Sequence, residues 1–295
     1  MSADVSVVVV TLDALPWVAR ALESVRGYET VVVDVGSTDG TLELVRDRFP
    51  HAQLVQTENH GLGAGWNEGI RRTSSRYVLF LNADAWVLGD GVEELAVFAD
   101  AHPRAAVLAP RLRNLDGTLQ RSVRGFPTPW RLATEYLFLR KLAPRSRALN
   151  AFYAGGFDHD AVREAEFVMG AVMLVRRTAI EEVGGLDEDF FLFSEETDWH
   201  YRFVQAGWQV LFTPDAEAVH VGGASHGGRF FVDQVTGHLR FLAKHRGVRE
   251  AERARRLLVV SLRLRAQAFR GERGRMYGEA AEKLASASVP ELLRR

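Results

Sequence analysis

The chain has 295 residues, 47% of them hydrophobic, which is enough for a substantial core in one large domain or two small ones. Its formal net charge of −1 gives no electrostatic reason to expect a nucleic-acid partner. Because it has no cysteine, disulfides and thiolate metal sites are excluded. Any metal must be bound by carboxylate, carbonyl, imidazole or water, which favours a hard divalent ion.

No targeting or membrane-spanning signal is found. The N-terminus has no positive flank, and the apolar run 5–10 is too short for a signal peptide. No apolar run approaches the roughly 20 residues of a spanning helix. We therefore expect a cytoplasmic protein, in solution or peripheral at the inner face of the cell membrane.

Short apolar strands alternate with amphipathic helices from residue 5 to about residue 110. Strands are expected at 6–11, 30–34, 53–56, 77–82 and 106–109. Helices are expected at 16–25, 41–48, 64–73 and 91–100. This alternation predicts an α/β fold with a mostly parallel, Rossmann-like sheet, covered on both faces, that binds ligands at the carboxyl ends of its strands.

The stretch 111–164 is less regular, with an Asp116-Gly117 turn and a helical piece at 130–141. It indicates an excursion from the sheet, of the kind that carries binding specificity. The periodic pattern then resumes with a strand at 167–175, helices at 178–183 and 198–206, and a strand at 209–213.

After His220 the chain becomes helical, with helices expected at 232–245 and 249–268. Between Arg249 and Arg275, nine arginines stand against three glutamates and alternate with apolar residues. One interpretation is a solvated helix that packs on the core or on a partner chain. The other is a basic amphipathic surface that binds anionic lipid headgroups.

These patterns divide the chain into two parts. The first is a domain at 1–247, with one half at about 1–110 and the other at about 111–247. The second is a basic, amphipathic helical extension at 248–295.

Carboxylates end two of the predicted strands. The apolar strand 77–82 is followed by Ala83 and Asp84, and Asp34 ends the strand at 30–34. Either aspartate could simply turn the chain, since Asp is common at strand ends. A carboxylate delivered to the edge of a parallel sheet is also a good ligand for a hard cation and the phosphates that accompany it.

The run 34–41 places carboxylates, hydroxyls and glycines between a strand and a helix. Its polar side chains could cap the helix. Capping does not explain Asp34, which can accept hydrogen bonds from a nucleobase or ribose. The glycine-rich run 59–67 could suggest a dinucleotide loop, but it follows the third strand rather than the first. Its glycines more simply allow close backbone approach, with Asn67 free for a polar contact.

The acidic cluster Glu195-Glu196-Thr197-Asp198 begins a predicted helix. Helix-dipole stabilisation explains one or two of its three acids. A carboxylate base near a sugar hydroxyl would contribute about 10² to 10⁴ in rate. His220, beyond the strand at 209–213 and a short turn, could reach the same pocket and share a metal with Asp84, although a lone histidine is more often structural.

Together these motifs resemble the inverting nucleotide-sugar glycosyltransferases of the GT-A fold, of the family 2 type, especially their bacterial rhamnosyltransferase-like branch. The resemblance covers roughly residues 5–247 and implies that the half at about 1–110 binds the donor and that the half at about 111–247 lies on the acceptor side. The motifs that carry it are Val8 to Leu12, Asp34 to Thr41, Asn59 to Gly69, Leu81 to Asp84, Gly170 to Arg177, Gly184 to Glu188, Glu195 to Asp198, Ala206 to Trp208, Pro214 and His220.

The resemblance implies that Asp84 coordinates Mg²⁺ or Mn²⁺ and that His220 is a further metal or diphosphate contact. Asn82 supplies no carboxylate, so Asp84 would be the metal ligand from its strand. The residues expected to bind the donor are Thr11, Asp34, Gly36, Ser37, Asp39, Gly63, Asn67, Asn82, Ala83 and Asp84.

Glu196 falls where the family's catalytic base usually lies, with Glu195 and Asp198 as the other candidate acids. The implied reaction is a metal-assisted single displacement that inverts the anomeric configuration. It would transfer a sugar, such as rhamnose, from a dTDP- or UDP-sugar to a glycan or lipid-linked acceptor in cell-wall or polysaccharide biosynthesis. The alternatives are a nucleotide-sugar-binding module without catalysis and a Rossmann-type NAD oxidoreductase.

Overall fold

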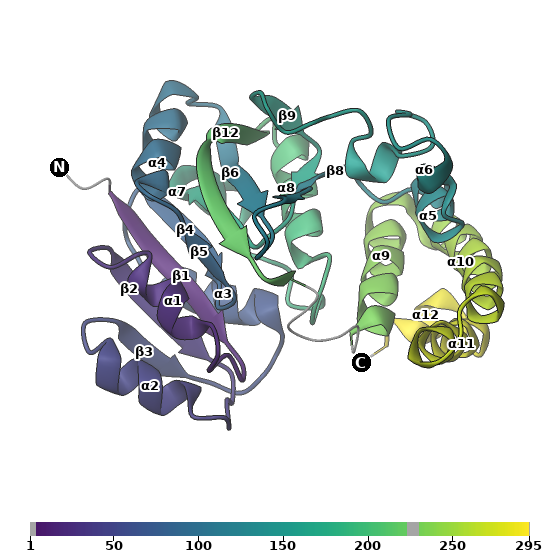
Figure 1. Cartoon of the computed structure of the whole chain (residues 1–295), viewed down its shortest axis with the longest axis horizontal. Helices are drawn as coiled ribbons and strands as arrows, with labels where there is room; N and C mark the ends of the chain where they lie inside the picture. The colour runs from purple at the N-terminus through teal and green to yellow at the C-terminus, as the bar shows by residue number, and fades with distance from the viewer. Residues whose placement is uncertain (1–3, 223–229, 295) are drawn as a thin grey trace.

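A single sheet forms the centre of the α/β part of the molecule. The computed structural model describes residues 4–222 and 230–294. Its main strands are β1 (Val5–Thr11), β2 (Glu29–Asp34), β3 (Gln53–Gln56), β4 (Tyr77–Asn82), β5 (Ala85–Val87), β6 (Ala105–Arg113), β11 (Val172–Arg176) and β12 (Gln209–His220). They follow the order β3-β2-β1-β4-β11-β6-β12-β5 across the sheet. The predicted α/β class is confirmed (Figure 1).

The first four strands of this order are parallel, and the strand order reverses at β1. Val10 of β1 is opposite Val33 of β2 and Asn82 of β4, so the carboxyl ends of the three strands lie at one edge. In a parallel sheet such a switch point opens a crevice at the carboxyl ends, where ligands bind.

Different helices cover the two faces of the sheet, because side chains alternate along each strand. The covering helices are α1 (Val18–Glu23), α2 (Thr41–Arg48), α3 (Leu62–Arg71), α4 (Gly91–Ala101), α7 (Arg177–Val183) and α8 (Glu195–Gln205). Val7 and Val9 of β1 pack with α1, α2 and α4, whereas Val8 and Val10 pack with α3, α7 and α8. Burial on both faces explains why the sequence of β1 shows no polar alternation.

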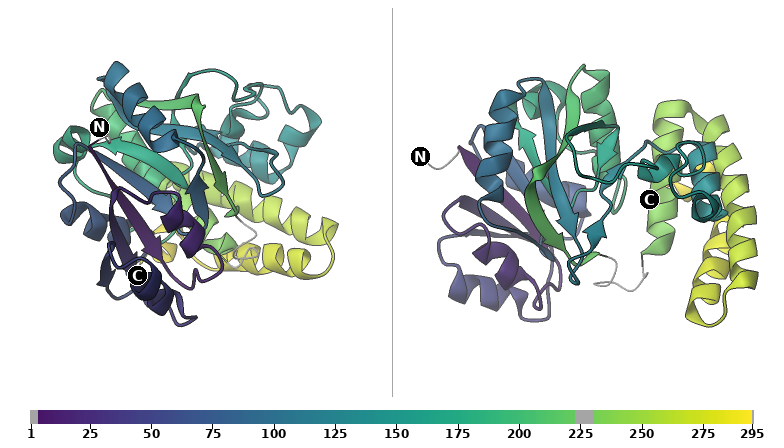
Figure 2. Two further views of the ribbon diagram at one scale, coloured as in Figure 1. Left: turned by 60° about the vertical axis from the view of Figure 1, so that its left-hand side comes forward. Right: turned by 45° about the horizontal axis from the view of Figure 1, so that its top comes forward.

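A helical region stands beside the sheet (Figure 2). It consists of α5 (Pro129–Tyr136), α6 (Leu139–Leu142), α9 (Phe231–Arg246), α10 (Val248–Ala268), α11 (Glu272–Ala285) and α12 (Val289–Leu292). Side chains from α5, α9, α10, α11 and α12 share one buried apolar cluster, which also includes Phe126 and Phe167 near the sheet. The predicted domain boundary at residue 247 falls between α9 and α10, two helices that share this cluster.

Two predicted elements are interrupted. The helical piece expected at 130–141 is divided into α5 and α6, because Phe138 adopts a left-handed conformation with φ of 58°. The strand expected at 167–175 is divided into β10 (Phe167–Val168), which pairs with β8 (Val123–Arg124), and β11, which joins the main sheet. One apolar run in the sequence does not reveal such a change of partner.

The strand expected at 209–213 is longer than predicted. β12 continues to His220, with a register shift between Phe212 and Glu217 where it pairs with β6. The turn expected before His220 is therefore an irregularity inside a strand. The end of β12 pairs antiparallel with β5, so that His220 lies opposite Ala85, the residue after Asp84.

The extension at 248–295 was expected to be helical, but no separate helix was placed after residue 268, because three glycines at 271, 274 and 278 weaken the pattern of α11. Among the described residues, no helix is both long enough and apolar enough to cross a bilayer. The expectation that there is no signal peptide used the first three residues, which lie outside the described range.

Candidate active site

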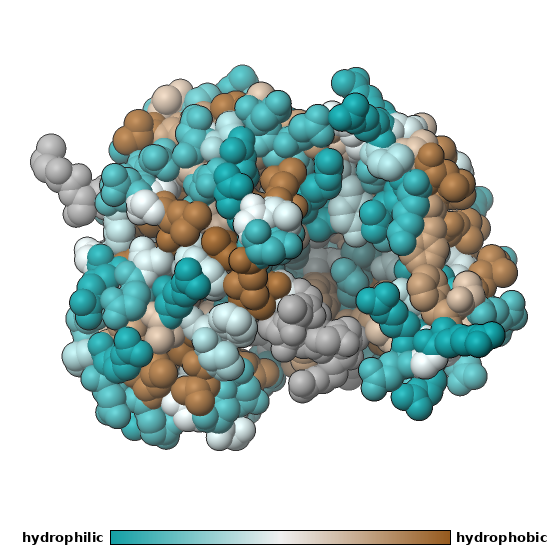
Figure 3. Space-filling view, viewed as in Figure 1, coloured by the Kyte–Doolittle hydropathy of each residue, from teal (hydrophilic) through white to brown (hydrophobic). Residues whose placement is uncertain are grey.

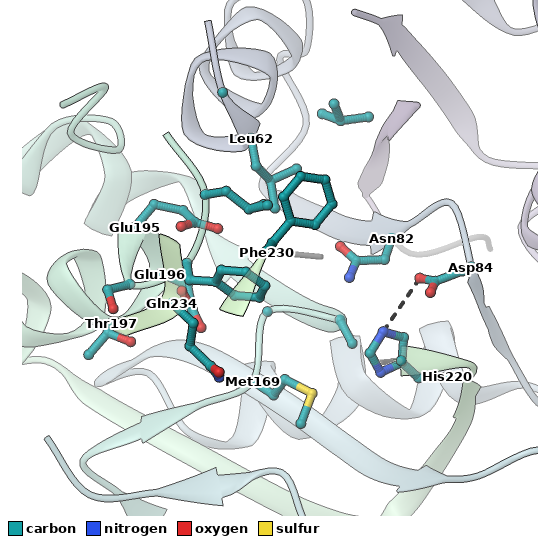
Figure 4. A pocket seen from close by; sticks show the side chains of 18 of the residues that line it. Leu62, Asn82, Asp84, Met169, Glu195, Glu196, Thr197, His220, Phe230 and Gln234 are labelled. Atoms are coloured by element: carbon teal, nitrogen blue, oxygen red, sulfur yellow. Dashed lines mark ion pairs between the residues drawn. The ribbon is translucent and has the colours of Figure 1, made fainter. Parts of the chain in front are cut away.

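A cavity of about 740 Å³ opens at the carboxyl ends of β1 and β4. Its position at the switch point of the sheet agrees with the place predicted from the strand pattern. Figure 4 shows Asp84 and His220 on one side of the cavity and Glu195 and Glu196 on the other. The strand end 82–84 lies in the wall, as do both glutamates and the histidine.

Asp84 and His220 form a polar corner of the cavity, with Asp84 Oδ1 3.4 Å from His220 Nε2. Gln120 fixes the ring. The side-chain Nε2 of Gln120 donates to the carbonyl oxygen of His220 at 3.1 Å and to Asn114 Oδ1 at 2.9 Å. This fixes the orientation of the amide, so Gln120 Oε1 must be the acceptor for His220 Nδ1, which lies 2.8 Å away. In the neutral imidazole this leaves the Nε2 lone pair directed at Asp84, as in a metal-ligating histidine.

This corner fits a hard divalent ion that shares its ligands with a substrate. Mg²⁺ and Mn²⁺ accept carboxylate oxygens, and such ions commonly combine one or two side chains with phosphate oxygens and water. Within the described residues, no three His, Asp or Glu side chains form a group that could hold a metal by themselves. An ion bound by Asp84 and His220 would therefore need further ligands from a substrate or from water.

A strained turn presents Glu195 and Glu196 to the cavity. The preceding Phe193 and Ser194 have φ of 66° and 72°, a conformation that costs a non-glycine residue about 1–3 kcal/mol. Helix α9 packs tightly on this turn, since a Cβ at Gly237 would lie 2.6 Å from the carbonyl oxygen of Phe193. The two acids then occupy the first turn of α8, where the helix dipole stabilises negative charge.

The two glutamates have different electrostatic surroundings. Burial, and then the charge of Glu196, raise the pKa of Glu195 well above its ordinary value. Burial also raises the pKa of Glu196, but hydrogen bonds from nearby backbone N–H groups and the charge of Arg124 oppose this effect. On each glutamate, Oε2 is buried without a hydrogen-bond partner among the described residues. In such a pair one carboxyl stays protonated while the other ionises.

Asp198, the third acid of the cluster, does not line the cavity. Its Oδ1 accepts from His245 Nε2 at 2.6 Å and lies 2.7 Å from Lys244 Nζ, and its Oδ2 accepts from Arg202 Nε at 2.9 Å. Burial by itself would raise its pKa, but the hydrogen bonds of His245 and Lys244 and the charge of Arg202 lower it. Asp198 therefore joins α8 to α9 and is not placed to take a proton from a molecule in the cavity.

Asp34, expected to bind the donor, is bonded to the protein itself. Its Oδ2 accepts from Thr11 Oγ1 at 2.9 Å, and its Oδ1 accepts from the backbone N–H groups of Gly36 and Ser37 at 3.0 Å. Only 1% of Asp34 is exposed, and none of these four residues lines the cavity. Asp34 fixes the ends of β1 and β2 and the loop that follows.

Ser37 and Asp39 hold the neighbouring loop. Ser37 Oγ accepts from the backbone N–H of Asp13, and Asp39 Oδ2 accepts from that of Leu15, both at 2.9 Å. The loop 12–14, held between these bonds, does line the cavity. Ser37 and Asp39 therefore shape the wall from behind, without forming part of it.

The glycine-rich helix α3 serves packing. A Cβ at Gly65 would lie 2.8 Å from Val10 Cγ1, so a larger residue would push α3 away from β1. Asn67 Nδ2 donates to the carbonyl oxygen of Leu186 at 2.9 Å, and Asn67 Oδ1 accepts from the backbone N–H of Leu186 at 2.8 Å. Neither Gly63 nor Asn67, both expected to bind the donor, lines the cavity.

Several wall residues belong to no motif that the sequence offered. They are Gln120, Arg124, Tyr153, Gln234 and His238. The first three lie in the irregular excursion, which was expected to carry specificity, but nothing in their spacing distinguished them. The last two lie on α9, which the sequence indicated only as a helix.

Comparisons with known proteins agree with this fold and show the family. A family model described as glycosyl transferase family 2 matches residues 6–183, more than half of the chain. The chain is also 29% identical, over 234 residues, to an N-acetylglucosaminyl-diphospho-decaprenol L-rhamnosyltransferase of Mycobacterium tuberculosis. That alignment covers 72% of this chain and 75% of the relative.

Two solved structures share the fold at low sequence identity. A mannosyltransferase of Pyrobaculum calidifontis, in complex with GDP-Man and Mn²⁺, matches with a TM-score of 0.58 and 18% identity, over 97% of this chain and 76% of that one. GalNAc-T7, with UDP, GalNAc and Mn²⁺, matches with a TM-score of 0.59 and 15% identity, over 98% of this chain and 55% of that one. These likenesses establish the GT-A fold.

Proposed function

The chain belongs to glycosyl transferase family 2 and is a glycosyltransferase, and we propose that it moves a sugar from a nucleoside diphosphate to an acceptor hydroxyl with inversion. One observation carries the proposal: a single cavity has Asp84 and His220 on one side and the acids Glu195 and Glu196 on the other. The leaving diphosphate needs the first pair, and the attacking hydroxyl needs a base from the second.

Asp84 and His220 are proposed to hold Mg²⁺ or Mn²⁺ against the donor diphosphate. When bound, the ion would neutralise the diphosphate and improve it as a leaving group. The ring orientation that Gln120 imposes supports this role. The donor would be a dTDP- or UDP-sugar, and the rhamnosyl group in the relative's name makes rhamnose the first sugar to test.

Glu196 is proposed as the base that takes the proton of the acceptor hydroxyl. Burial and the charge of Glu196 raise the pKa of Glu195, which favours its neutral form and disfavours a second charge beside the base. The backbone N–H groups and Arg124 favour the ionised form of Glu196, which a base requires. Asp198 is set aside because cationic side chains already occupy both of its oxygens.

The acceptor is proposed to be a lipid-linked saccharide, the class in the name of the mycobacterial relative. The outer surface of α10 supports contact with a membrane. Leu257, Val260 and Leu264 are 41%, 56% and 53% exposed on this helix, whereas Leu258 and Leu262 are buried against its neighbours. Apolar side chains also gather at the right-hand edge of Figure 3, where α10 lies.

Exposed arginines accompany this apolar row at 253, 256 and 263. A surface that combines both kinds of side chain suits an anionic lipid surface, by insertion and by charge. The packing interpretation from the sequence describes the buried side of α10, and the lipid-binding interpretation is proposed for its exposed side. Replacing Leu257, Val260 and Leu264 together by serine should reduce co-sedimentation with anionic vesicles, and equal co-sedimentation would remove this part of the proposal.

The donor side can be tested by calorimetry with UDP and dTDP, with and without Mn²⁺. We expect Mn²⁺ to increase the affinity of the wild-type protein, and Asp84→Ala to remove that increase. Equal affinity with and without the ion in the wild type would contradict the metal role.

Transfer itself can be tested with a panel of nucleotide sugars, first for protection against thermal unfolding and then for turnover. The anomeric configuration of the product, read by NMR, tests inversion. Donor binding with neither transfer nor donor hydrolysis would favour a binding module without catalysis. Protection by NAD alone would favour an oxidoreductase.

A further inference from the structure

Arg124 is a cationic residue of the cavity wall whose guanidinium stacks on an aromatic ring. It ends the short strand β8, opposite Phe167 of β10, and lines the cavity. Its guanidinium carbon lies 4.0 Å from the centre of the Tyr153 ring, another wall residue. Among the residues that the structure describes, its side chain has this stacking contact but no ion pair or hydrogen bond.

A second arginine beside the same ring provides a contrast. Arg140 lies 4.6 Å from the centre of Tyr153, but it is ion-paired with Glu135 and does not line the cavity. One guanidinium on this tyrosine is thus neutralised within the protein, while the other faces the space that a substrate would enter.

The charges of Glu135 and Glu196 act on Arg124, but among the described residues neither carboxylate forms an ion pair or hydrogen bond with it, and Glu135 is paired with Arg140. His238 lies in the same wall, and burial, together with the charge of Arg124, lowers its pKa to about 4, so the ring is neutral at pH 7. Arginine stays protonated in proteins, and a poorly solvated charge without a partner is unfavourable. An anion that entered the cavity here would relieve that cost.

The position of Arg124 indicates which substrate would bring the anion. Two wall residues near it, Tyr153 and His238, come from the excursion and from α9, whereas the donor corner lies after β4 and at the end of β12. The charge of Arg124 also acts on Glu196, the proposed base. Arg124 therefore lies on the side of the cavity where the acceptor hydroxyl must be.

We propose that Arg124, stacked on Tyr153, binds a phosphate ester group of the acceptor. A guanidinium can donate two parallel hydrogen bonds to a phosphate, a fork that lysine does not offer. The contact would select acceptors that carry phosphate close to the reacting sugar and would hold the hydroxyl near Glu196. The inference deepens the proposed function, on which it rests for the identity of the acceptor side.

The test is calorimetry with geranyl phosphate as the probe and geraniol as its uncharged analogue, in the presence of saturating UDP and Mn²⁺. We expect the wild type to bind the phosphate and Arg124→Gln to bind it roughly tenfold to a hundredfold more weakly. Arg124→Lys should recover only part of the affinity. Arg140→Gln, which removes an arginine from the same tyrosine, should bind as the wild type does.

Unfolding curves of all variants establish that each is folded. The inference is overturned if the wild type does not bind geranyl phosphate or if geraniol binds equally well. It is also overturned if Arg124→Gln and Arg140→Gln lose affinity for geranyl phosphate alike. It is also overturned if UDP competes with the probe and Arg124→Gln weakens UDP instead, because Arg124 would then be a donor ligand. Since binding is read without turnover, a failure of the proposed sugar transfer would appear separately.

Discussion

Two polar regions of this molecule look similar in sequence and differ in the structure. The loops after β1 and β2, at 11–15 and 34–41, are rich in carboxylates and hydroxyls, and these groups bond to one another and to backbone N–H groups. The turn at 193–196 carries two adjacent glutamates that each leave a buried oxygen without a partner among the described residues.

A polar motif beside a cavity therefore need not line it. A satisfied carboxylate such as Asp34 defines the shape of the wall, and it would lose hydrogen bonds if it turned to a ligand. A buried carboxylate oxygen without a partner is unfavourable unless a substrate uses it.

Glu196→Gln should lower the rate of transfer about 10²-fold to 10⁴-fold, because the amide cannot accept the acceptor proton. Binding of the nucleoside diphosphate should stay nearly unchanged. Turnover and calorimetry on the same preparation measure both effects. Glu195→Gln is the matched control and should lose far less activity, so the reverse order would assign the base to Glu195.

Asp198→Asn should lower the free energy of unfolding by about 3 kcal/mol at pH 7, because three basic side chains would lose a buried partner. The pKa of Asp198 is lowered in the folded protein, so its stabilisation is complete above the unfolded value of about 3.9 and is lost as the pH falls through the folded value. Urea unfolding should therefore show wild type and variant converging in acid. A constant difference between them would argue against this network.

Gly237→Ala should lower the free energy of unfolding by about 1–3 kcal/mol and reduce turnover, because the new methyl group would press on the strained turn before Glu195. Gly278→Ala is the control, since a Cβ there would meet its nearest neighbour, Ala266 Cβ, at 3.9 Å. That change in α11 should be neutral or stabilising by up to about 1 kcal/mol. If both changes affected the free energy of unfolding and turnover equally, the close contact of Gly237 with the turn before Glu195 would have no special role.

Glu195→Gln should increase the free energy of unfolding at pH 7 by about 1 kcal/mol. Because the folded pKa of Glu195 is raised, the wild type is at its most stable below the unfolded value of about 4.3 and loses stability as the pH rises through the folded value. The gain should therefore vanish below about pH 4. Denaturant titrations from acid to neutral pH measure it, and a gain that persists in acid would point to another cause.

Ser37→Ala should have the smallest effect, about 0.5 kcal/mol of stability, because it removes one exposed hydrogen bond to the N–H of Asp13. The rate at saturating donor should not change. A large loss of donor affinity, measured by calorimetry, would mean that Ser37 contacts the donor directly and that the contrast between the two regions is wrong.

Much of the fold could be predicted from the sequence. Strands buried on both faces give continuous valine runs, as in β1, and the alternation with helices requires a mostly parallel sheet with its ligand site at the carboxyl ends. The family resemblance followed from the motifs, and the match of the family model confirmed it.

The candidate site was predicted less completely. Asp84, His220 and the two adjacent glutamates are in the cavity wall, whereas Thr11, Asp34, Asn67 and others of the expected donor ligands are not. Their catalytic and binding roles stay predictions. Arg124 and Gln120 could not be identified from sequence, because neither belongs to a spaced motif.

The class of fold, the family and the ends of the strands around which the site forms could all be inferred from the amino-acid sequence. These depend on local periodicity and on short motifs. The tertiary structure decided which polar groups face the cavity, since that depends on partners distant in the chain. The pairing of β12 with β5 brings His220 to Asp84, and α9 holds the turn that presents Glu196. Local propensity carries no information about such pairings.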